Sequence, residues 1–295
     1  MSLPAAFFSV ILIWSTTPLA IKWSALGVSF SFAVLLRMVI GAVICAVLLR
    51  VFRIPFPLHR RARQAYLAGG LSMFSTMVLT YWAAQFVSSG LIAVLFGLTP
   101  LITSLGAMMW LKEEALTPNK LAAMLLGLAG LALVFGGSLG VREGSLPGLL
   151  AVLMAVMAQS LGLVWLKRIG DDSPPLAMTL GILVVAIPLF FAVWWLLDGH
   201  VPVALPERAM AAIVYLGVFG SVLGFALYYY LIKHMEAGRI ALISLITPVM
   251  ALLLGHALNN ESVLPQVWLG TGCILLGLCL HRWGAQWLAC AMMRR

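Results

Sequence analysis

Ten apolar stretches, each long enough to cross a lipid bilayer, constrain this chain more than any other feature of its sequence. A membrane-spanning helix needs about 20 apolar residues, and the chain is 63% hydrophobic and only 9% charged. Because backbone polar groups inside a bilayer must be satisfied within their own segment, stretches of this kind predict helices. The predicted fold class is an all-α integral membrane protein with ten transmembrane helices, at residues 3–26, 30–49, 65–86, 89–110, 120–138, 146–166, 176–197, 209–232, 239–258 and 266–283.

The second half of the chain repeats features of the first, although chance similarity between leucine-rich helices is the alternative. At one constant offset, five residues of the first half match five of the second: Tyr81, Gly90, Thr99, Pro100 and Glu113 align with Tyr229, Gly238, Thr247, Pro248 and Glu261. Five spans per half is an odd number, so the halves are predicted to be inverted relative to each other. We expect a first five-helix repeat at 1–138, a second, inverted repeat at 146–283, and a cytoplasmic tail at 284–295.

The net charge of +9 is interpreted as a topology signal and as contact with anionic lipid, and no nucleic-acid partner is expected. If the N-terminus is cytoplasmic, the outer loops hold only Arg142 and Arg208 among the cations counted. The inner segments then hold Arg50, Arg53, Arg60, Arg61, Arg63, Lys112, Lys120, Lys167, Arg168, Lys233, Arg239, Arg282, Arg294 and Arg295. Because cytoplasmic segments are enriched in Lys and Arg, both termini are predicted to be cytoplasmic.

The sequence shows no catalytic set, and an enzyme is not expected. Residues 136–140 fit the GxSxG pattern, but they end a glycine-rich helix instead of forming a strand-to-helix turn. The cysteines lack CxxC spacing and are interpreted as small apolar residues, so no disulfide, metal site or other cofactor is expected. All acidic residues fall at span ends or in loops, which argues against a proton-driven exporter of cationic drugs. His256 is the one titratable side chain in a span that could carry a proton, with a structural role as the alternative.

Polar and aromatic side chains inside the predicted spans are the candidates for substrate binding, because they should face protein or water. Arg37 lies about 10 Å into its span, where it could pair with a substrate carboxylate or pin helix-end carbonyls. Tyr81 and Gln85 are expected to share a helix face that suits a zwitterion with an aromatic side chain. The other candidates, each of which could instead contact a neighbouring helix, are Trp14, Ser15, Gln159, Tyr229 and Ser244.

Three further features concern helix geometry and helix ends. Pro100 and Pro248 lie near the middle of their spans and are predicted hinges, each freeing a carbonyl that a preceding threonine could satisfy. Gly220 and Gly224 predict close helix packing. Lys22, near the outer end of the first span, is expected to reach the lipid headgroups, with attraction of amino-acid carboxylates as the alternative.

Several of these residues carry a family resemblance. Ile13-Trp14-Ser15 through Ala20-Ile21-Lys22, Arg37, Leu98-Thr99-Pro100 with Glu113, and the glycine-rich helix from Gly127 to Gly137 resemble the EamA repeat of the drug/metabolite transporter superfamily. The second half repeats the pattern more loosely, with Thr247-Pro248, Glu261, Gly270 and Gly277. Ile182 stands at the counterpart of Arg37, so any role of Arg37 belongs to one half only.

Within that superfamily the chain is similar to bacterial inner-membrane amino-acid exporters, including the branch that handles aromatic amino acids and methyl viologen. The resemblance implies an exporter of small neutral or amphipathic metabolites, above all amino acids including aromatic ones, by alternating access about a midplane cavity. The lack of an acidic residue in the middle of a span favours facilitated export. The expected partners are a small-molecule substrate and membrane lipid, with a monomer expected and a dimer as the alternative. Alternative functions are proton-coupled export of a nucleobase, a drug or a methyl viologen-like cation and, in other classes, a multispan membrane enzyme or a structural assembly protein.

Overall fold

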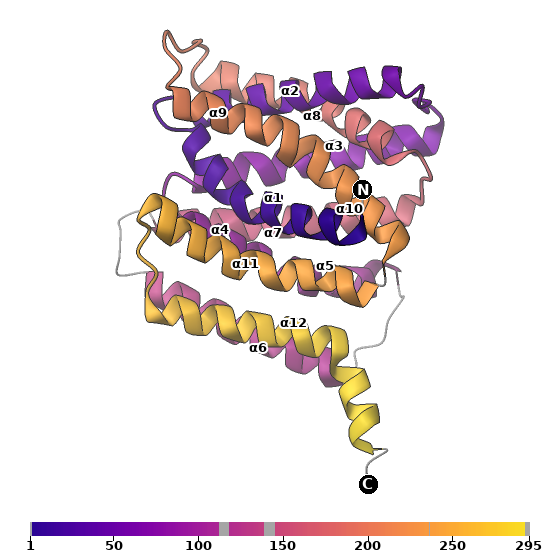
Figure 1. The fold of residues 1–295 in the computed structure, drawn as a ribbon, viewed down its shortest axis with the longest axis vertical. Coiled ribbons are helices and arrows are strands. Elements are labelled where there is room, and N and C mark those ends of the chain that lie inside the picture. Colours follow the sequence, from indigo (N-terminus) through magenta and orange to yellow (C-terminus); the bar gives the residue numbers. More distant parts are fainter. Residues whose placement is uncertain (1, 112–117, 139–144, 236, 293–295) are drawn as a thin grey trace.

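The structure is a computed structural model that describes residues 2–111, 118–138, 145–235 and 237–292 (Figure 1). The described residues form helices and short connections without a β-strand, so the predicted all-α fold class is confirmed. The helices in chain order are α1 (Leu3–Ser24), α2 (Phe30–Val51), α3 (Arg60–Ala83), α4 (Ser89–Phe96), α5 (Thr99–Leu111), α6 (Pro118–Ser138), α7 (Ser145–Ile169), α8 (Pro175–Leu197), α9 (Glu207–Tyr215), the π-helix η1 (Leu216–Leu223), α10 (Gly224–His234), α11 (Ala237–Asn259) and α12 (Pro265–Met292).

Two of the predicted spans are interrupted and the others are continuous helices within the described ranges. The fourth predicted span is divided into α4 and α5, and the eighth consists of α9, η1 and α10. Among the described residues, six segments are long and apolar enough to cross a membrane: Leu3–Ser24, Phe30–Val51, Ser89–Trp110, Leu146–Ile169, Pro175–Leu197 and Glu207–Tyr228. Shorter apolar stretches lie in the helices α6, α11 and α12.

Side chains next to the helix starts satisfy backbone donors that a helix leaves free. Ser29 accepts a hydrogen bond from the Phe32 N–H at the start of α2, and Ser88 accepts one from Leu91 at the start of α4. His59 Nδ1 accepts from the Ala62 N–H at the start of α3. Local sequence therefore defines where these helices begin.

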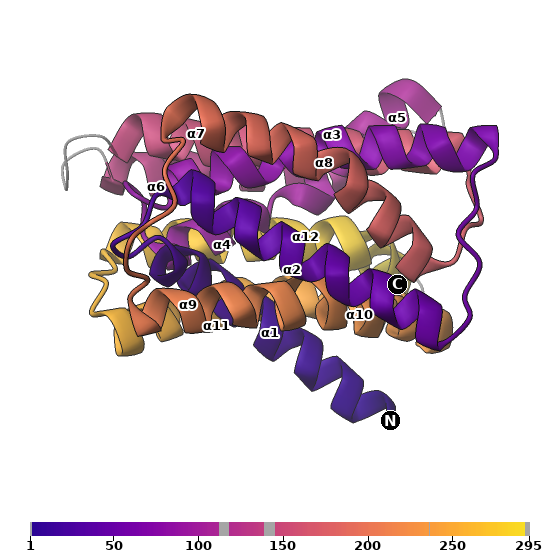
Figure 2. The same cartoon turned by 90° about the horizontal axis from the view of Figure 1, so that it is seen from above.

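Helices of residues 1–138 pack mainly against helices of the second half. The helix pairs with extensive contacts include α2 with α8, α3 with α7, α4 with α11 and α6 with α12. Figure 1 shows α6 and α12 together at the edge opposite α2 and α8. Viewed from above, the helices run roughly side by side along one common direction (Figure 2). The two halves are thus interleaved, and their inverted relationship stays a prediction.

The α6–α12 pair depends on glycines. A Cβ atom added at Gly130 would lie 2.6 Å from the carbonyl oxygen of Gly270, and one added at Gly270 would lie 2.6 Å from that of Gly130. Only residues without a side chain allow the two backbones to approach this closely, which is a common way to join helices in membranes.

The surface of the bundle is apolar along its length. Large apolar side chains such as Leu12, Val43, Leu125 and Trp195 are more than half exposed. Contiguous exposed apolar surface of this extent is rare on soluble monomers, whereas lipid is a suitable solvent for it. The bundle is therefore built to be surrounded by a bilayer.

Candidate functional site

A buried arginine lies between α2, α3 and η1. Arg37 is 4% exposed, and its Nε donates to Ser221 Oγ at 3.1 Å. Its Nη1 lies 3.4 Å from Tyr81 Oη and 4.0 Å from Met77 Sδ. The structure thus brings together Arg37 and Tyr81, two of the residues predicted from the sequence, and adds Ser221, which sequence reasoning missed.

Glycines make the space that this guanidinium occupies. A Cβ atom at Gly220 would lie 3.2 Å from Arg37 Nη2, and one at Gly217 would lie 2.6 Å from Ile40 Cγ2. On the facing helix, a Cβ atom at Gly41 would lie 3.2 Å from Ser221 Cβ. As predicted for Gly220, small residues let η1 approach α2 closely.

Ser221 reaches Arg37 from a π-helical turn. The eighth predicted span changes from α to π geometry at Leu216–Leu223 and returns to α geometry at Gly224. Such turns are rare and are found frequently at functional sites, because the extra residue per turn rotates side chains out of the α-helical register. Nothing in the local hydropathy pattern distinguishes this segment from an ordinary helix, so the role of Ser221 could not be predicted from the sequence.

Arg37 forms no ion pair with an acidic residue in the part of the chain that the structure describes. An arginine stays protonated in proteins, and a buried charge is costly unless it is paired and hydrogen-bonded. Its hydrogen-bond partners Ser221 and Tyr81 are both neutral, so neither of them balances the positive charge. An anion that entered this region, such as a carboxylate, would therefore find a preorganised cationic partner.

Trp14 belongs to an aromatic group between α1 and α10. Its ring centroid lies 4.8 Å from that of Tyr228 and 6.3 Å from that of Phe225. Two residues further along α1, Thr16 Oγ1 lies 2.6 Å from Tyr215 Oη. Ser15 is buried, and its hydroxyl has no hydrogen-bond partner among the described residues.

The remaining predicted residues lie elsewhere. α3 ends at Ala83, so Gln85 does not share a helix face with Tyr81; it is exposed, and its Nε2 donates to the Trp82 carbonyl. Gln159 is half-buried on α7, and no hydrogen bond joins it to Arg37 or Tyr81 within the described residues. Two further predicted residues lie on α10 and α11 with side chains outside the described part: Tyr229 and Ser244.

The two predicted hinge prolines lie in different local structures. The helix is broken at residues 97–98, just before Pro100, and Thr99 Oγ1 has no hydrogen-bond partner among the described residues. In contrast, α11 runs unbroken through Pro248, and Thr247 Oγ1 donates to the Ile243 carbonyl at 2.7 Å. Pro248 frees the carbonyl of residue 244, so the bond from Thr247 to Ile243 does not satisfy it. The expectation that a threonine satisfies the freed carbonyl is therefore wrong in both halves, since Thr99 has no partner among the described residues and Thr247 bonds a different carbonyl.

A second polar site, missed by the sequence reasoning, lies at one end of the bundle. Lys22 Nζ is 3.3 Å from Glu261 Oε1 and donates to the Val87 carbonyl, also at 3.3 Å. We call this end, which gathers the last turn of α1, the start of α4 and residues 259–264, the Lys22 end. Lys22 therefore pairs with a carboxylate, and the interpretation that it reaches lipid headgroups is corrected.

Glu261 is held by more groups than Lys22. Its Oε2 accepts hydrogen bonds from the Ser89 backbone N–H at 2.9 Å and the Ser89 hydroxyl at 2.8 Å, at the start of α4. Its Oε1 accepts from Asn259 Nδ2 at 2.9 Å. Burial by itself raises the pKa of the Glu261 carboxyl, but the Lys22 charge and the hydrogen bonds from Ser89 and Asn259 outweigh it, and the pKa is lowered.

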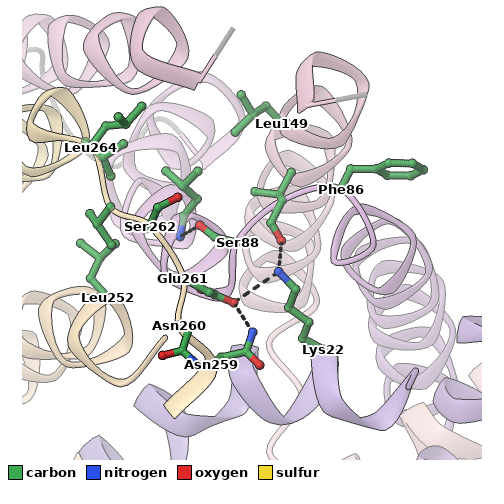
Figure 3. A pocket seen from close by; sticks show the side chains of 14 residues that line it. Lys22, Phe86, Ser88, Leu149, Leu252, Asn259, Asn260, Glu261, Ser262 and Leu264 are labelled. Carbon is green, nitrogen blue, oxygen red and sulfur yellow. Dashed lines mark hydrogen bonds and ion pairs between the residues drawn. The ribbon is translucent and has the colours of Figure 1, made fainter. Parts of the chain in front are cut away.

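A cavity of about 380 Å³ opens beside this pair. Figure 3 shows Lys22 and Glu261 facing each other on one side of it, with Leu149, Leu252 and Leu264 around it. The volume is within the range of about 300–1,000 Å³ typical of small-molecule sites. The cavity thus combines two opposite charges with an apolar wall.

The opposite end of the bundle, which we call the His59 end, has a cavity of another kind. His59 Nε2 lies 3.6 Å from Asp171 Oδ1 there. An apolar cavity of about 520 Å³ lies between α2, α8 and the η1–α10 segment. It extends from Val222, next to Ser221, to Phe52 and Pro174 beyond the helix ends. On α2 its lining starts at Ile44, so this cavity lies on the His59 side of Arg37, and neither Arg37 nor Ser221 lines it.

Cysteines and metal-ligating residues form no cofactor site in the described part of the chain. Cys45, Cys273 and Cys279 are free thiols. No group of three or more His, Cys, Asp or Glu side chains that could hold a metal ion is found among the described residues.

An all-α bundle with an apolar surface, a buried guanidinium between its halves and an ion pair across one end has the features of a multi-pass membrane transporter. The EamA-like transporter family matches residues 3–136 and 146–283, and the chain belongs to that family.

Comparisons with individual proteins agree with this assignment. The "Uncharacterized inner membrane transporter YedA" of Escherichia coli strain K12 is 27% identical over 285 residues, which cover 93% of this chain and 89% of that protein. The "Probable amino-acid metabolite efflux pump" of the same strain is 27% identical over 182 residues, covering 59% of this chain and 61% of that protein. A solved structure described as "Crystal structure of protein" shares the fold, with a TM-score of 0.68 at 21% identity over 97% of this chain and 99% of that one.

Proposed function

We propose that this protein exports small neutral or amphipathic metabolites, specifically amino acids including aromatic ones, across the bacterial inner membrane by facilitated alternating access. The observation that carries the proposal is the buried Arg37 guanidinium, bonded only to neutral groups among the described residues. A substrate carboxylate would supply the missing negative charge. The name of the matched amino-acid metabolite efflux pump supports the same substrate class.

The surroundings of Arg37 suit an amphipathic substrate. The apolar cavity at the His59 end would admit an apolar side chain, and its wall at Val222 adjoins Ser221. Trp14 and Tyr228 form an aromatic surface between α1 and α10. Aromatic rings of a substrate gain both apolar burial and ring contacts on such a surface.

The transport cycle would exchange access between the two ends of the bundle. In this cycle the ion pair of Lys22 and Glu261 would close one end, and the apolar cavity at the His59 end would give access from the other. By the distribution of Lys and Arg along the chain, the His59 end would face the cytoplasm and the Lys22 end the periplasm. Pro100 and Pro248 remain the proposed hinges, the former beside the break at residues 97–98.

The placement of titratable groups supports facilitated export. His256, the candidate proton carrier, is exposed on the last turn of α11, where its Nδ1 lies 3.0 Å from the Glu261 carbonyl oxygen. A proton relay across the bilayer would need titratable groups within the spans. Export would instead be driven by the cytoplasmic excess of substrate.

Uptake of radiolabelled phenylalanine and threonine into proteoliposomes tests the proposal. Saturable uptake without an imposed pH gradient, absent from protein-free liposomes, is the expected result. Uptake that requires a pH gradient would overturn the facilitative mechanism and favour the proton-coupled alternative. If folded protein transported neither amino acid, the substrate class would be wrong, and nucleobases or cations such as methyl viologen would be tested next.

A further inference from the structure

We propose that the cavity at the Lys22 end is a second binding site, which takes a zwitterionic amino acid with its carboxylate on Lys22 and its ammonium on Glu261. The substrate would thus bind between Lys22 and Glu261 and separate the two side chains of this ion pair. The choice of an amino acid rests on the proposed function. The site itself is distinct from the Arg37 region and is argued from its own geometry.

The two charges of the pair are held with unequal strength. Glu261 Oε2 is bound to the start of α4 through the Ser89 N–H and hydroxyl at 2.9 and 2.8 Å. Lys22 lies 3.3 Å from both of its partners, whereas charge-assisted N–H···O bonds are usually about 2.7–2.9 Å long. Its side chain is 24% exposed, against 6% for Glu261. Lys22 is therefore the partner that can move away, while Glu261 stays in place.

The Oε1 atom of Glu261 is the one that faces Lys22. Oε2 is engaged with α4, and Oε1 is the atom shared between Lys22 and Asn259. An ammonium group that replaced Lys22 at Oε1 would keep the hydrogen bonds of Oε2 intact. Lys22, released from Glu261, would have its charge compensated by the carboxylate of the same ligand.

One part of the cavity wall is apolar and suits an apolar side chain. Its walls include Leu91, Leu149, Leu252, Leu264 and Val267, together with Phe86. An amino acid bound through both charged groups would bury its side chain against these residues. The cavity thus favours apolar or aromatic amino acids over charged ones.

Both charges of the ligand are required by this arrangement. A carboxylate without an ammonium would satisfy Lys22 but leave Glu261 buried and unpaired, and an amine without a carboxylate would do the reverse. Leaving one charge of a buried pair without a partner weakens binding by about tenfold or more. The cavity should therefore distinguish phenylalanine from both 3-phenylpropionate and phenethylamine.

A thiol-protection experiment in lipid nanodiscs tests this directly. The four native cysteines are replaced, and Ser262→Cys places a thiol on the exposed wall of the cavity. Val203→Cys, on the exposed loop between α8 and α9, is the matched control. The rate of reaction with a soluble maleimide is measured with phenylalanine, 3-phenylpropionate or phenethylamine, in variants with unchanged elution and helical content.

The expected result is that phenylalanine alone slows labelling of the Ser262→Cys variant several-fold and leaves the Val203→Cys variant unaffected. Adding Lys22→Met or Glu261→Gln should raise the phenylalanine concentration needed for half-protection by about tenfold or more. Adding Arg37→Met should leave protection in place. Equal protection by 3-phenylpropionate or phenethylamine, or its loss with Arg37→Met, would overturn the proposal.

A direct measurement covers the possibility that the cysteine-free protein does not fold. Calorimetric titration of phenylalanine into the Arg37→Met protein, which keeps its native cysteines, should show binding that the added Lys22→Met change weakens by about tenfold or more. Undiminished binding in that double variant would contradict the site. If the wild-type protein transported phenylalanine but showed neither protection nor binding at this site, this inference alone would be wrong. If protection were seen without any phenylalanine flux, only the proposed function would be wrong.

Discussion

Lys22 Nζ lies 3.3 Å from Glu261 Oε1, so an ion pair joins the last turn of α1 to the connection between α11 and α12. Glu261 in turn accepts hydrogen bonds from the start of α4. One carboxylate thus joins three segments at one end of the bundle: α1 and α4 from the first half, and the α11–α12 connection from the second. The physical consequences of that arrangement can be tested separately from transport.

Removing the Glu261 side chain should destabilise the folded protein more than removing its charge. Glu261→Ala leaves the Ser89 N–H and hydroxyl without their acceptor, which we expect to cost about 2–4 kcal/mol. Glu261→Gln keeps an acceptor oxygen and should cost about 1 kcal/mol, because Lys22 is partly exposed. Thermal unfolding of the purified proteins in detergent measures both, and equal midpoints for the two variants would contradict the role of the Ser89 hydrogen bonds.

The same carboxylate should make stability depend on pH. The pKa of Glu261 in the folded protein lies below its ordinary value of 4.5, so the unfolded chain binds more protons in that range. The stability that the ionised carboxylate contributes is therefore fully present above pH 4.5 and is lost as the pH falls through the lower folded-state pKa. Unfolding midpoints of wild type and Glu261→Gln should converge as the pH is lowered through this window. A difference between them that stayed constant down to the lowest pH would argue against this linkage.

Loss of the buried guanidinium should impair transport of carboxylate-bearing substrates. We expect Arg37→Met to lower phenylalanine flux in proteoliposomes by about tenfold or more, since a charged contact to the substrate is lost. Arg37→Lys should restore flux only in part, because lysine lacks the planar fork that can bind Ser221, Tyr81 and a carboxylate together. Arg50→Met, at the exposed end of the same helix, is the control. Equal flux in the Arg37→Met and Arg50→Met proteins would count against the proposed substrate contact.

The α6–α12 contact should tolerate no side chain at its closest point. A Cβ atom at Gly270 would lie 2.6 Å from the Gly130 carbonyl oxygen, whereas one at Gly272, on the same helix, has no atom within 4 Å. Gly270→Ala should lower stability by about 1–3 kcal/mol through overpacking. Gly272→Ala should leave it unchanged or raise it slightly, because alanine favours helix. Unfolding midpoints that changed alike in both variants would show that the contact is not as close as described.

Local sequence was sufficient for some of the site and insufficient for the rest. Arg37 and Tyr81 were found because a polar side chain in an apolar span must face protein, which is a property of each residue and its neighbours in sequence. Helical spacing predicts Gln85 on the same face as Tyr81, but α3 ends at Ala83, because the position of a helix end depends on tertiary contacts as well as on local sequence. The contact between Ser221 and Arg37 depends on a π-helical turn, and the hydropathy pattern does not predict that turn.

The sequence by itself determined the all-α membrane fold class and the approximate positions of the spans. It could do so because, in a bilayer, hydrogen bonds within each segment and apolar side chains around it decide the local structure. Only the tertiary structure decided that Lys22 meets Glu261, that the fourth span breaks before Pro100, and that Arg37 meets Ser221. These features depend on which helices become neighbours, and that choice is made by packing between segments far apart in the chain.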